Sequence, residues 1–477
     1  HRADMAQIKG MGANFVRLAH YPQDPEVYRA ADSLGILLWD EVPWNRGGVG
    51  GDEFKANTRR LMREMIRQNF NHPSIILWSV GNEVGDVPDE GRADPEAING
   101  FISELNAIAH QLDPDRLTSM RKHNEGAHLV DVYSPSIWAG WYSGVYTNYE
   151  KAINDARARF PRLVHTEYGA DGHVGRHTEN PITGAGVLAE GWEEAVGQVQ
   201  VNNIAQNGDW SESYQTDLLD WHLMVSERQP WFAGNAQWVF KDFATPLRPE
   251  NPIPYMNQKG LVDRAGVPKD AYYVFRSRWT DNSDFAYIVS HTWTERSGPA
   301  GRPRKVRVYS NCARVELSVN GAGQGVRARD PNAFPAQGLV WDVTFAEGAN
   351  RLEARCPAAP AVRDTLTVRY SHTQAGAPNR LELTSRPLPN GNLLVEAVMV
   401  DTAGHRLLNF SERVYFAHDG GGELLVHHGT PTRSRVIEAA NGRAAIELVP
   451  PRRGERAVME ARTQDFKGIH LIIEGTR

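Results

Sequence analysis

The sequence predicts a (β/α)8 TIM barrel at its N-terminal end, followed by two all-β immunoglobulin-like sandwich domains. Over residues 1–282, apolar β-rich runs alternate with helical stretches, which is the pattern of a parallel sheet with helical crossovers. Polar and charged residues stand directly after these runs. Further on, short alternating runs separated by Gly, Asn and Pro turns replace the helical stretches. We expect the barrel over 1–282, one sandwich over 283–372 and a second over 373–477.

Three β/α units open the predicted barrel. Their β-rich runs lie at 13–20, 35–41 and 74–83, and the helical stretches that follow cover 24–35, 53–69 and 95–113. Units that alternate in this way within roughly 100 residues form parallel strands joined by right-handed helical connections.

Four shorter strands continue the sheet, at 116–120, 128–135, 162–169 and 231–240. The total is seven, whereas eight strands close a barrel. The chain does not start with Met, and no recognisable element precedes residue 13. We therefore expect the first strand, apparently absent here, to lie ahead of residue 1, together with any export signal.

The strand ends carry the side chains from which a site could be built. An open α/β sheet would place a Gly-rich phosphate loop after a strand, and none follows here, whereas a barrel keeps its active site at the carboxyl ends of its strands. Those positions hold His20, Asp40, Glu41, Asn82, Glu83, Tyr133, Glu167, Trp238 and Asp242. A carboxylate there points into the mouth of the barrel, where loss of water can raise its pKa. Taken singly, it could equally be a solvated loop residue or a helix N-terminal charge.

Composition narrows the classes of partner. The 477 residues carry a net charge of −6, with 41% hydrophobic and 23% charged residues, the balance of a soluble globular protein. No apolar stretch is long enough to span a bilayer, and the Arg residues form no basic stripe. We expect neither a membrane nor nucleic acid as a partner. Thirteen Trp and fifteen Tyr residues suit the faces of sugar rings, although core packing is their commoner role.

Two glutamates in characteristic motifs suggest a family. Glu83 ends "WSVGNE" and Glu167 lies in "HTEYGAD", on the third and sixth visible strands. With one strand missing in front, these become the fourth and seventh. The two motifs resemble the catalytic motifs of glycoside hydrolase family 2, and "FVRLAHYP", "DPEVYRAADSLGILLWDE" and "NHPSIILWSVGNE" match the same family in order and spacing. The resemblance covers residues 1 to about 280.

The resemblance implies a retaining exo-β-glycosidase that needs no metal and no cofactor. Glu83 would be the acid/base and Glu167 the nucleophile, as retention requires two carboxyl groups roughly 5 to 5.5 Å apart. Asn82 would bind the sugar 2-hydroxyl. Further implied substrate-binding residues are His20, Asp40, Glu41, Trp138, Tyr142, Tyr168 and Trp238. Their plainer roles are structural: Asp40 and Glu41 could pair with Arg17, and Trp238 could pack in the core.

Two stretches concern the sugar. Asn257 and Lys259, in "YMNQKGLVD", resemble the Asn-x-Lys pair with which β-glucuronidases of the family hold a C6 carboxylate, although "KGLVD" is also a general family turn. The loop "DVYSPSIWAGWY" resembles a β-glucuronidase loop but has Ser136 and Trp138 where that group has Asn and Tyr. We expect a β-galactosidase by family label, with β-glucuronidase or β-galacturonidase as the alternative. A non-catalytic carbohydrate-binding or adhesion protein is the distant alternative.

Partners and metals follow from the same resemblance. It implies an oligosaccharide or polysaccharide substrate and leaves a homo-oligomer open. His165, His173 and His177 lie close in sequence. We expect no metal site there, because the family's chemistry requires none and the last two fall in a loop without helical spacing.

The C-terminal sandwiches are expected to pack and space the molecule rather than to bind sugar. The first covers 285–372 and holds both cysteines, Cys312 and Cys356. The two could form a bridge between neighbouring strands or remain buried thiols. An exported enzyme, periplasmic or secreted, would suit a bridge, while a cytoplasmic location is not excluded.

Overall fold

The computed structural model describes residues 1–86, 94–189, 192, 198–425 and 435–475. The chain forms two compact units. The first unit comprises His1–Gly169, His222–Trp238 and Arg278–Ser283, and the second comprises Ala170–Trp221, Val239–Ser277 and Asp284–Arg477. Each compact unit is thus assembled from several segments of the chain.

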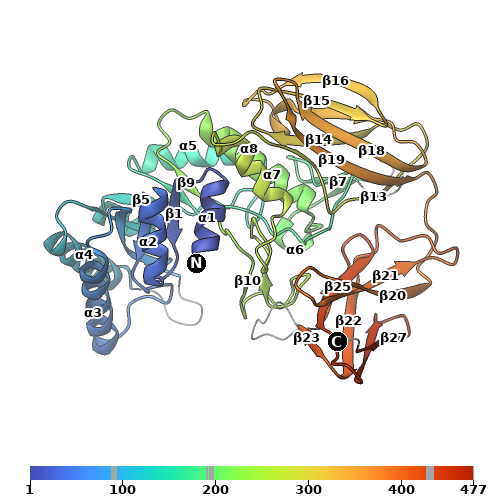
Figure 1. Cartoon of the computed structure of the whole chain (residues 1–477). Coiled ribbons are helices and arrows are strands. Elements are labelled where there is room, and N and C mark those ends of the chain that lie inside the picture. Colours follow the sequence, from blue (N-terminus) through green and yellow to red (C-terminus); the bar gives the residue numbers. More distant parts are fainter. Residues whose placement is uncertain (87–93, 190–191, 193–197, 426–434, 476–477) are drawn as a thin grey trace. The chain divides into compact units, whose positions relative to one another are not determined.

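The first unit contains the parallel strands of the barrel (Figure 1). Five of them form one sheet in the order β1 (Phe15–Leu18), β2 (Leu37–Glu41), β3 (Ile75–Asn82), β4 (Leu117–Arg121) and β5 (Val132–Ser134). A parallel bridge from Tyr133 to Leu163 leads on to β6 (His165–Thr166), which pairs with β9 (Asn235–Ala236). Residues of β9 and β1 in turn approach one another. All seven expected strands are present in the expected order among the described residues.

Helices follow most of these strands, as expected for β/α units. They are α2 (Pro25–Leu34), α3 (Asp52–Asn69), α4 (Pro95–Leu112) and α5 (Tyr149–Arg159), with short 3-10 turns η1 (Asn124–Leu129) and η2 (Tyr146–Asn148). Asp24 caps α2 by accepting from the Glu26 N–H, and the helix ends at Gly35, whose φ of 65° suits glycine. These signals fix both ends of the helix.

The structure adds a helix where the sequence showed no element. α1 (Arg2–Gly10) precedes β1. Only Met5 and Ile8 are buried in it, so its apolar stripe is too short to stand out in the sequence.

Strands β2 and β3 are largely buried on both faces, which explains their continuous apolar character. Seven of the eight residues of β3 are buried, and Ile76 is the exception. The indole rings of Trp39 and Trp78 are fully buried. These strands are thus rigid supports for whatever follows them.

The second unit combines barrel segments with two sandwiches. The barrel segments contain β7 (Val187–Ala189), β8 (Gln198–Gln200), α6 (Ile204–Asn207), β10 (Phe243–Ala244) and β11 (Met256–Asn257). Helices α7 (Glu212–Glu227) and α8 (Asp270–Trp279) contribute residues to both units.

Each sandwich consists of two sheets, as the sequence predicts. The first contains β12 (Ala286–Ile288), β14 (Arg304–Ser310) and β17 (Val340–Val343) in one sheet, and β13 (Glu295–Ser297), β19 (Ala359–Ser371), β18 (Gly348–Cys356), β15 (Arg314–Val319) and β16 (Ala322–Ala328) in the other, with η3 (Ala336–Gly338) between strands. The second contains β20 (Arg380–Pro387), β21 (Leu393–Val400), β25 (Arg443–Val449) and β23 (Glu423–Leu425), facing β24 (Val436–Glu438), β22 (Arg413–Gly420), β26 (Arg456–Arg462) and β27 (Ile469–Glu474).

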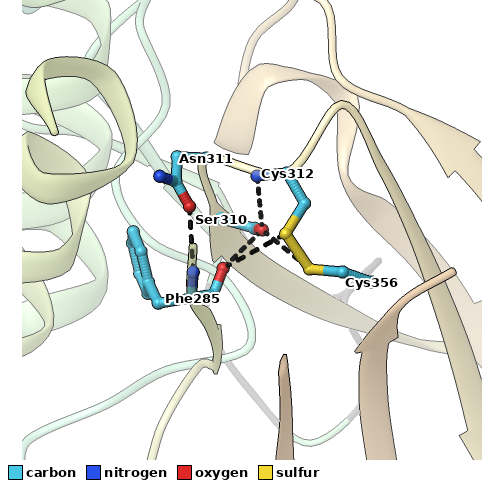
Figure 2. The surroundings of a disulfide bond; sticks show 5 residues. All are labelled: Phe285, Ser310, Asn311, Cys312 and Cys356. Atoms are coloured by element: carbon cyan, nitrogen blue, oxygen red, sulfur yellow. Dashed lines mark hydrogen bonds between the residues drawn. A yellow bond between two sulfur atoms is a disulfide. The ribbon is translucent and has the colours of Figure 1, made fainter. Parts of the chain in front are cut away.

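A disulfide joins Cys312 and Cys356, so the two cysteines are bridged rather than free (Figure 2). Cys312 lies in the turn between β14 and β15, and Cys356 ends β18. The Ser310 hydroxyl accepts from the Cys312 N–H at 3.0 Å and donates to the Phe285 carbonyl at 2.6 Å. The bridge therefore pins a turn that connects the two sheets of the sandwich.

No helix among the described residues has the length and apolar character needed to cross a membrane.

Candidate active site

Charged side chains converge at the carboxyl ends of the parallel strands in the first unit. Arg17 lies in β1, Glu41 ends β2, and Arg121 ends β4. Glu83 and Glu167 directly follow β3 and β6. Because parallel strands end at the same rim of a barrel, side chains that are distant in sequence meet here.

Glu83 and Glu167 share one nitrogen atom of Arg121. The Arg121 Nη1 lies 2.7 Å from Glu83 Oε1 and 2.8 Å from Glu167 Oε2. These two carboxylate oxygens therefore cannot lie further apart than the roughly 5 to 5.5 Å typical of retaining glycosidases. This upper bound is compatible with direct nucleophilic attack and too short for an inverting pair, whose carboxyl groups lie about 6.5 to 9.5 Å apart.

Both glutamates also adopt an unusual backbone conformation. Their φ angles are 50° for Glu83 and 63° for Glu167, in the left-handed region that non-glycine residues rarely enter. Such conformations cost on the order of 1 to 3 kcal/mol and are concentrated at functional sites. The same unusual backbone at the ends of two separate strands aims the two carboxylates toward one nitrogen.

Arg17 connects the nucleophile candidate to the neighbouring strands. Its guanidinium contacts Glu167 Oε1 at 2.5 Å, Glu41 Oε2 at 2.9 Å and Asn82 Oδ1 at 2.8 Å. His20 lies beside it, with Nδ1 2.8 Å from Glu41 Oε1 and Nε2 3.9 Å from Glu167 Oε1. The structure thus brings His20, Glu41 and Asn82 together with the two catalytic candidates.

The guanidinium groups set the ionisation of this cluster. Burial raises the pKa of Glu83, but the nearby Arg121 outweighs it, and the pKa lies below the ordinary value. Burial acts in the same way on Glu167, where Arg121 and Arg17 together bring the pKa below its ordinary value. The pKa of Glu41 falls to about 2, since Arg17 and His20 overcome the effect of burial. The expectation that burial raises the pKa of strand-end carboxylates therefore does not hold for Glu83 and Glu167.

Asp40 is not part of this cluster. It precedes Glu41 on β2, and successive side chains of a strand point to opposite faces. Its carboxylate accepts from the Tyr28 hydroxyl at 3.1 Å and the Asn69 amide at 3.0 Å, on α2 and α3. Burial raises its pKa to about 6. Asp40 thus faces the helices, whereas Glu41 faces Arg17.

The aromatic candidates divide between cluster and core. Trp238 stacks on His20 with ring centroids 5.1 Å apart, next to the carboxylates. Tyr168 is fully buried, and its hydroxyl donates to Asn235 Oδ1 at 2.5 Å. We find Tyr168 in a buried aromatic stack with His222 rather than among the charged groups.

Trp138 and Tyr142 lie on a loop that starts beside Arg121. Their rings meet edge to face at a centroid distance of 5.0 Å, and Tyr142 is 45% exposed. The Ser136 hydroxyl, at the start of the loop, accepts from Arg121 Nη2 at 3.2 Å. The loop that carries this aromatic pair is therefore joined to Arg121 by the Ser136 hydrogen bond.

Asn257 and Lys259 belong to the second unit, where Lys259 is fully buried. The Lys259 ammonium pairs with the Asp171 carboxylate. Asn257 Oδ1 accepts from the Lys259 N–H at 3.1 Å, and Asp171 Oδ1 accepts from the Gln258 N–H at 2.7 Å. The Asn-x-Lys segment is thus held by its own side chains and by one carboxylate.

The three histidines considered for a metal do not gather. His165 lies in the first unit, and His173 and His177 lie in the second. Burial lowers the pKa of each to about 3, so all three are neutral. Within the part of the chain that the structure describes, no group of three or more His, Cys, Asp or Glu side chains could hold a metal ion.

Sequence reasoning missed Arg121, the residue that both glutamates contact. The strand was expected to end at residue 120, whereas β4 includes Arg121 as its last residue. A charged residue directly after the expected strand "RLTSM" was the available signal, and Glu83 likewise stands at the end of an expected strand.

Comparisons with known proteins identify a family and several relatives. Residues 1–283 match the model of glycosyl hydrolases family 2, TIM barrel domain, and residues 301–357 match a domain of unknown function. A putative β-glucuronidase from Formosa agariphila is 55% identical over 99% of this chain and 58% of its own length. The crystal structure of a Parabacteroides merdae β-glucuronidase is 38% identical, with a TM-score of 0.91 over 99% of this chain and 60% of that one.

A second solved structure, that of Bacteroides uniformis β-glucuronidase 3, is 40% identical, with a TM-score of 0.90 over 99% of this chain and 59% of its own. The chain therefore spans about three fifths of the length of these relatives.

Proposed function

The chain belongs to glycoside hydrolase family 2, and we propose that it hydrolyses terminal β-linked uronides with retention of configuration, as a β-glucuronidase. The observation that carries the proposal is the pair of carboxylates on one Arg121 nitrogen, at 2.7 and 2.8 Å. Their separation suits a double displacement, in which one carboxylate attacks the sugar directly.

In the first half-reaction, the Glu167 carboxylate attacks the anomeric carbon. The bond to the leaving oxygen breaks, and that oxygen takes a proton from Glu83. Arg17 and Arg121 lower the pKa of Glu167 and keep it ionised. Because Arg121 lowers the pKa of Glu83 as well, the step takes place in the fraction of enzyme molecules in which Glu83 carries its proton. A sugar ester of Glu167 and a free aglycone are the products of this step.

In the second half-reaction, water attacks the same carbon. Glu83, now ionised, takes a proton from the water, the new carbon–oxygen bond forms, and the ester bond to Glu167 breaks. Two inversions give net retention, and both carboxyl groups return to their starting states. Asn82, which accepts from Arg17 at 2.8 Å and donates to Asn45 at 2.8 Å, is held in place to bind the sugar 2-hydroxyl.

A uronide is favoured over a neutral galactoside for two reasons. The three relatives described above are named as β-glucuronidases, one of them putative. The chain also carries the Asn257 and Lys259 pair, and an amide with an ammonium suits an anionic sugar. Because the Lys259 ammonium pairs with Asp171, a sugar carboxylate would share this ammonium with Asp171. β-Glucuronidase thus replaces the β-galactosidase label that the sequence alone suggested.

The disulfide supports a further part of the proposal, an oxidising location. Cys312 and Cys356 are bridged inside a small sandwich. Such bridges persist in the periplasm or outside the cell, and glutathione and thioredoxin keep most cytosolic thiols reduced. We accordingly propose export as the setting in which the enzyme works.

A panel of p-nitrophenyl glycosides tests the activity. The full-length protein is assayed with β-glucuronide, β-galacturonide, β-galactoside and β-mannoside under identical conditions. The proposal expects kcat/KM to be highest for the β-glucuronide. A preference for the β-galactoside would restore the β-galactosidase label, and release from none of the four would favour a carbohydrate-binding protein.

A further inference from the structure

Arg121 holds both catalytic candidates from the interior of the barrel. Its side chain is fully buried, whereas 16% of the Glu83 side chain and 9% of the Glu167 side chain are exposed. A buried guanidinium must use its donors on fixed acceptors, because an unpaired charge in the interior is costly. Its contacts therefore show what it is built to hold.

The remaining donors of Arg121 fix its orientation. Nη2 donates to the Ser136 hydroxyl at 3.2 Å, and Nε donates to the Thr166 carbonyl at 3.4 Å. Nη1 lies 3.4 Å from Asn82 Oδ1 in addition to its two carboxylate contacts. Acceptors from several strands thus keep Nη1 between Glu83 and Glu167.

Arg121 differs from Arg17, the other buried arginine of the cluster. Arg17 contacts Glu167 but also forms an ion pair with Glu41, which neutralises it. Among the described residues, the carboxylates that Arg121 contacts are Glu83 and Glu167. Its charge is therefore divided between the two groups that must exchange charge during a double displacement.

We propose that Arg121 is a positioning residue that couples the ionisation of Glu83 to the charge of Glu167 through the two half-reactions. This inference rests on the proposed function. While Glu167 is ionised, it takes part of the Arg121 charge and leaves less of that charge to stabilise ionised Glu83. When Glu167 becomes an uncharged ester, the whole guanidinium charge acts on Glu83 and stabilises the carboxylate that serves as base.

The other charged neighbours each act on one member of the pair. Lys122, after β4, and Arg46, after β2, lie 3.4 and 3.5 Å from Glu83, and both also contact Asp86. Arg17 and His20 face Glu167 from β1 and the loop after it. Within the residues that the structure describes, Arg121 is the cation in contact with both carboxylates.

The lowered pKa values of Glu83 and Glu167 agree with this assignment, since Arg121 is the largest lowering influence on each. Removing its charge should raise the pKa of both carboxyl groups. Glu167 must be ionised and Glu83 protonated for the first half-reaction. Both limbs of the pH profile of kcat/KM should therefore move to higher pH.

The test compares pH profiles of kcat/KM on p-nitrophenyl β-glucuronide for the wild type, Arg121→Gln, Arg121→Met and Arg121→Lys. We expect both limbs to move up by about 1 to 3 pH units in the Gln and Met variants and to stay near wild type in Arg121→Lys, which keeps the charge. Lower activity with unmoved limbs would overturn the proposal.

Arg116→Gln is the matched control, because Arg116 precedes β4 and pairs with Asp113 at 2.6 Å. Both limbs of the kcat/KM pH profile of Arg116→Gln should stay where they are in the wild type. Thermal unfolding establishes that each variant is folded. If Arg121→Gln and Arg121→Met both failed to fold beside a folded Arg121→Lys, Arg121 would be structural and the coupling role would be wrong. A wild type inactive on every glycoside would instead refute the proposed function itself.

Discussion

The molecule buries charge in two different ways. The first is the carboxylate cluster of the first unit, which contains Arg17, Glu41, Glu83, Arg121 and Glu167. The second is the lysine network of the second unit, which contains Lys259, Asp171, Gln258 and His173. In the carboxylate cluster, Arg17 and Arg121 each contact more than one acidic group, and Glu83 remains 16% exposed. In the lysine network, Lys259 pairs with Asp171, and both side chains are at most 1% exposed. Shared partners in a partly exposed site allow charge to redistribute when one group is neutralised, whereas a fully buried ion pair fixes a geometry.

Hydrogen bonds through His173 extend the lysine network to the second sandwich. His173 is neutral, and its Nε2 lies 2.7 Å from the Glu438 carbonyl, which can only accept. Nε2 therefore donates, and Nδ1 accepts from the Gln258 amide at 3.0 Å. Gln258 in turn donates its N–H to Asp171 at 2.7 Å. The segment around Lys259 is thus tied to β24 of the second sandwich, which gives that domain a part in shaping the lysine network.

The largest effect is expected when the nucleophile is removed from the carboxylate cluster. Glu167→Gln should lower turnover by on the order of 10⁴-fold or more for every aglycone, because nothing then attacks the anomeric carbon. Steady-state assays with good and poor leaving groups measure this loss. Substantial turnover of any β-glycoside by this variant would show that another residue is the nucleophile.

The next largest effect distinguishes the roles of the two carboxylates. Glu83→Gln should slow poor leaving groups by about 10²- to 10⁴-fold, since they need a proton, and spare p-nitrophenol in the first step. Added azide should restore turnover by attacking the ester in place of water, and the product should be a β-glycosyl azide. An α-glycosyl azide from this variant would reverse the roles of Glu83 and Glu167.

A smaller effect on activity is expected from substitutions in the lysine network. Loss of a charge-assisted contact to a substrate carboxylate costs about 1.5 to 3 kcal/mol, or roughly ten- to two-hundred-fold in kcat/KM. Lys259→Ala alone would leave Asp171 buried without its partner, so the sharper variant is Lys259→Met with Asp171→Asn. Activity on β-glucuronide should fall by that factor while any activity on β-galactoside stays level. Equal losses on both would assign Lys259 to the architecture of the turn.

The smallest effect on activity is expected from a site outside both regions. Replacing both Cys312 and Cys356 by Ser removes the disulfide and should destabilise the sandwich by about 2 to 4 kcal/mol, as judged by urea unfolding. The pH limbs and the sugar preference should not change. A shift of either would mean that the sandwich controls the active site more directly than its contacts indicate.

Sequence reasoning identified what local patterns and motifs encode. Apolar runs revealed all seven barrel strands, and the motifs singled out Glu83 and Glu167. Sequence reasoning failed where a shift of one residue along a strand, or a partner far away in the sequence, decides what a side chain contacts. Asp40 and Glu41 were both expected either to bind the substrate or to pair with Arg17, yet neighbours on a strand face opposite sides, and Glu41 is the one that contacts Arg17. The Asp171 partner of Lys259 is 88 residues away in sequence, and no local pattern reveals such a pair.

The most direct test of the central claim is the anomeric form of the first product. Proton NMR follows p-nitrophenyl β-glucuronide during hydrolysis by the wild-type protein, before mutarotation mixes the anomers. We predict that β-glucuronic acid appears first and that the α-anomer grows in later, because two displacements at carboxylates sharing Arg121 retain the configuration. If α-glucuronic acid appeared first, the double displacement through Glu167 would be contradicted.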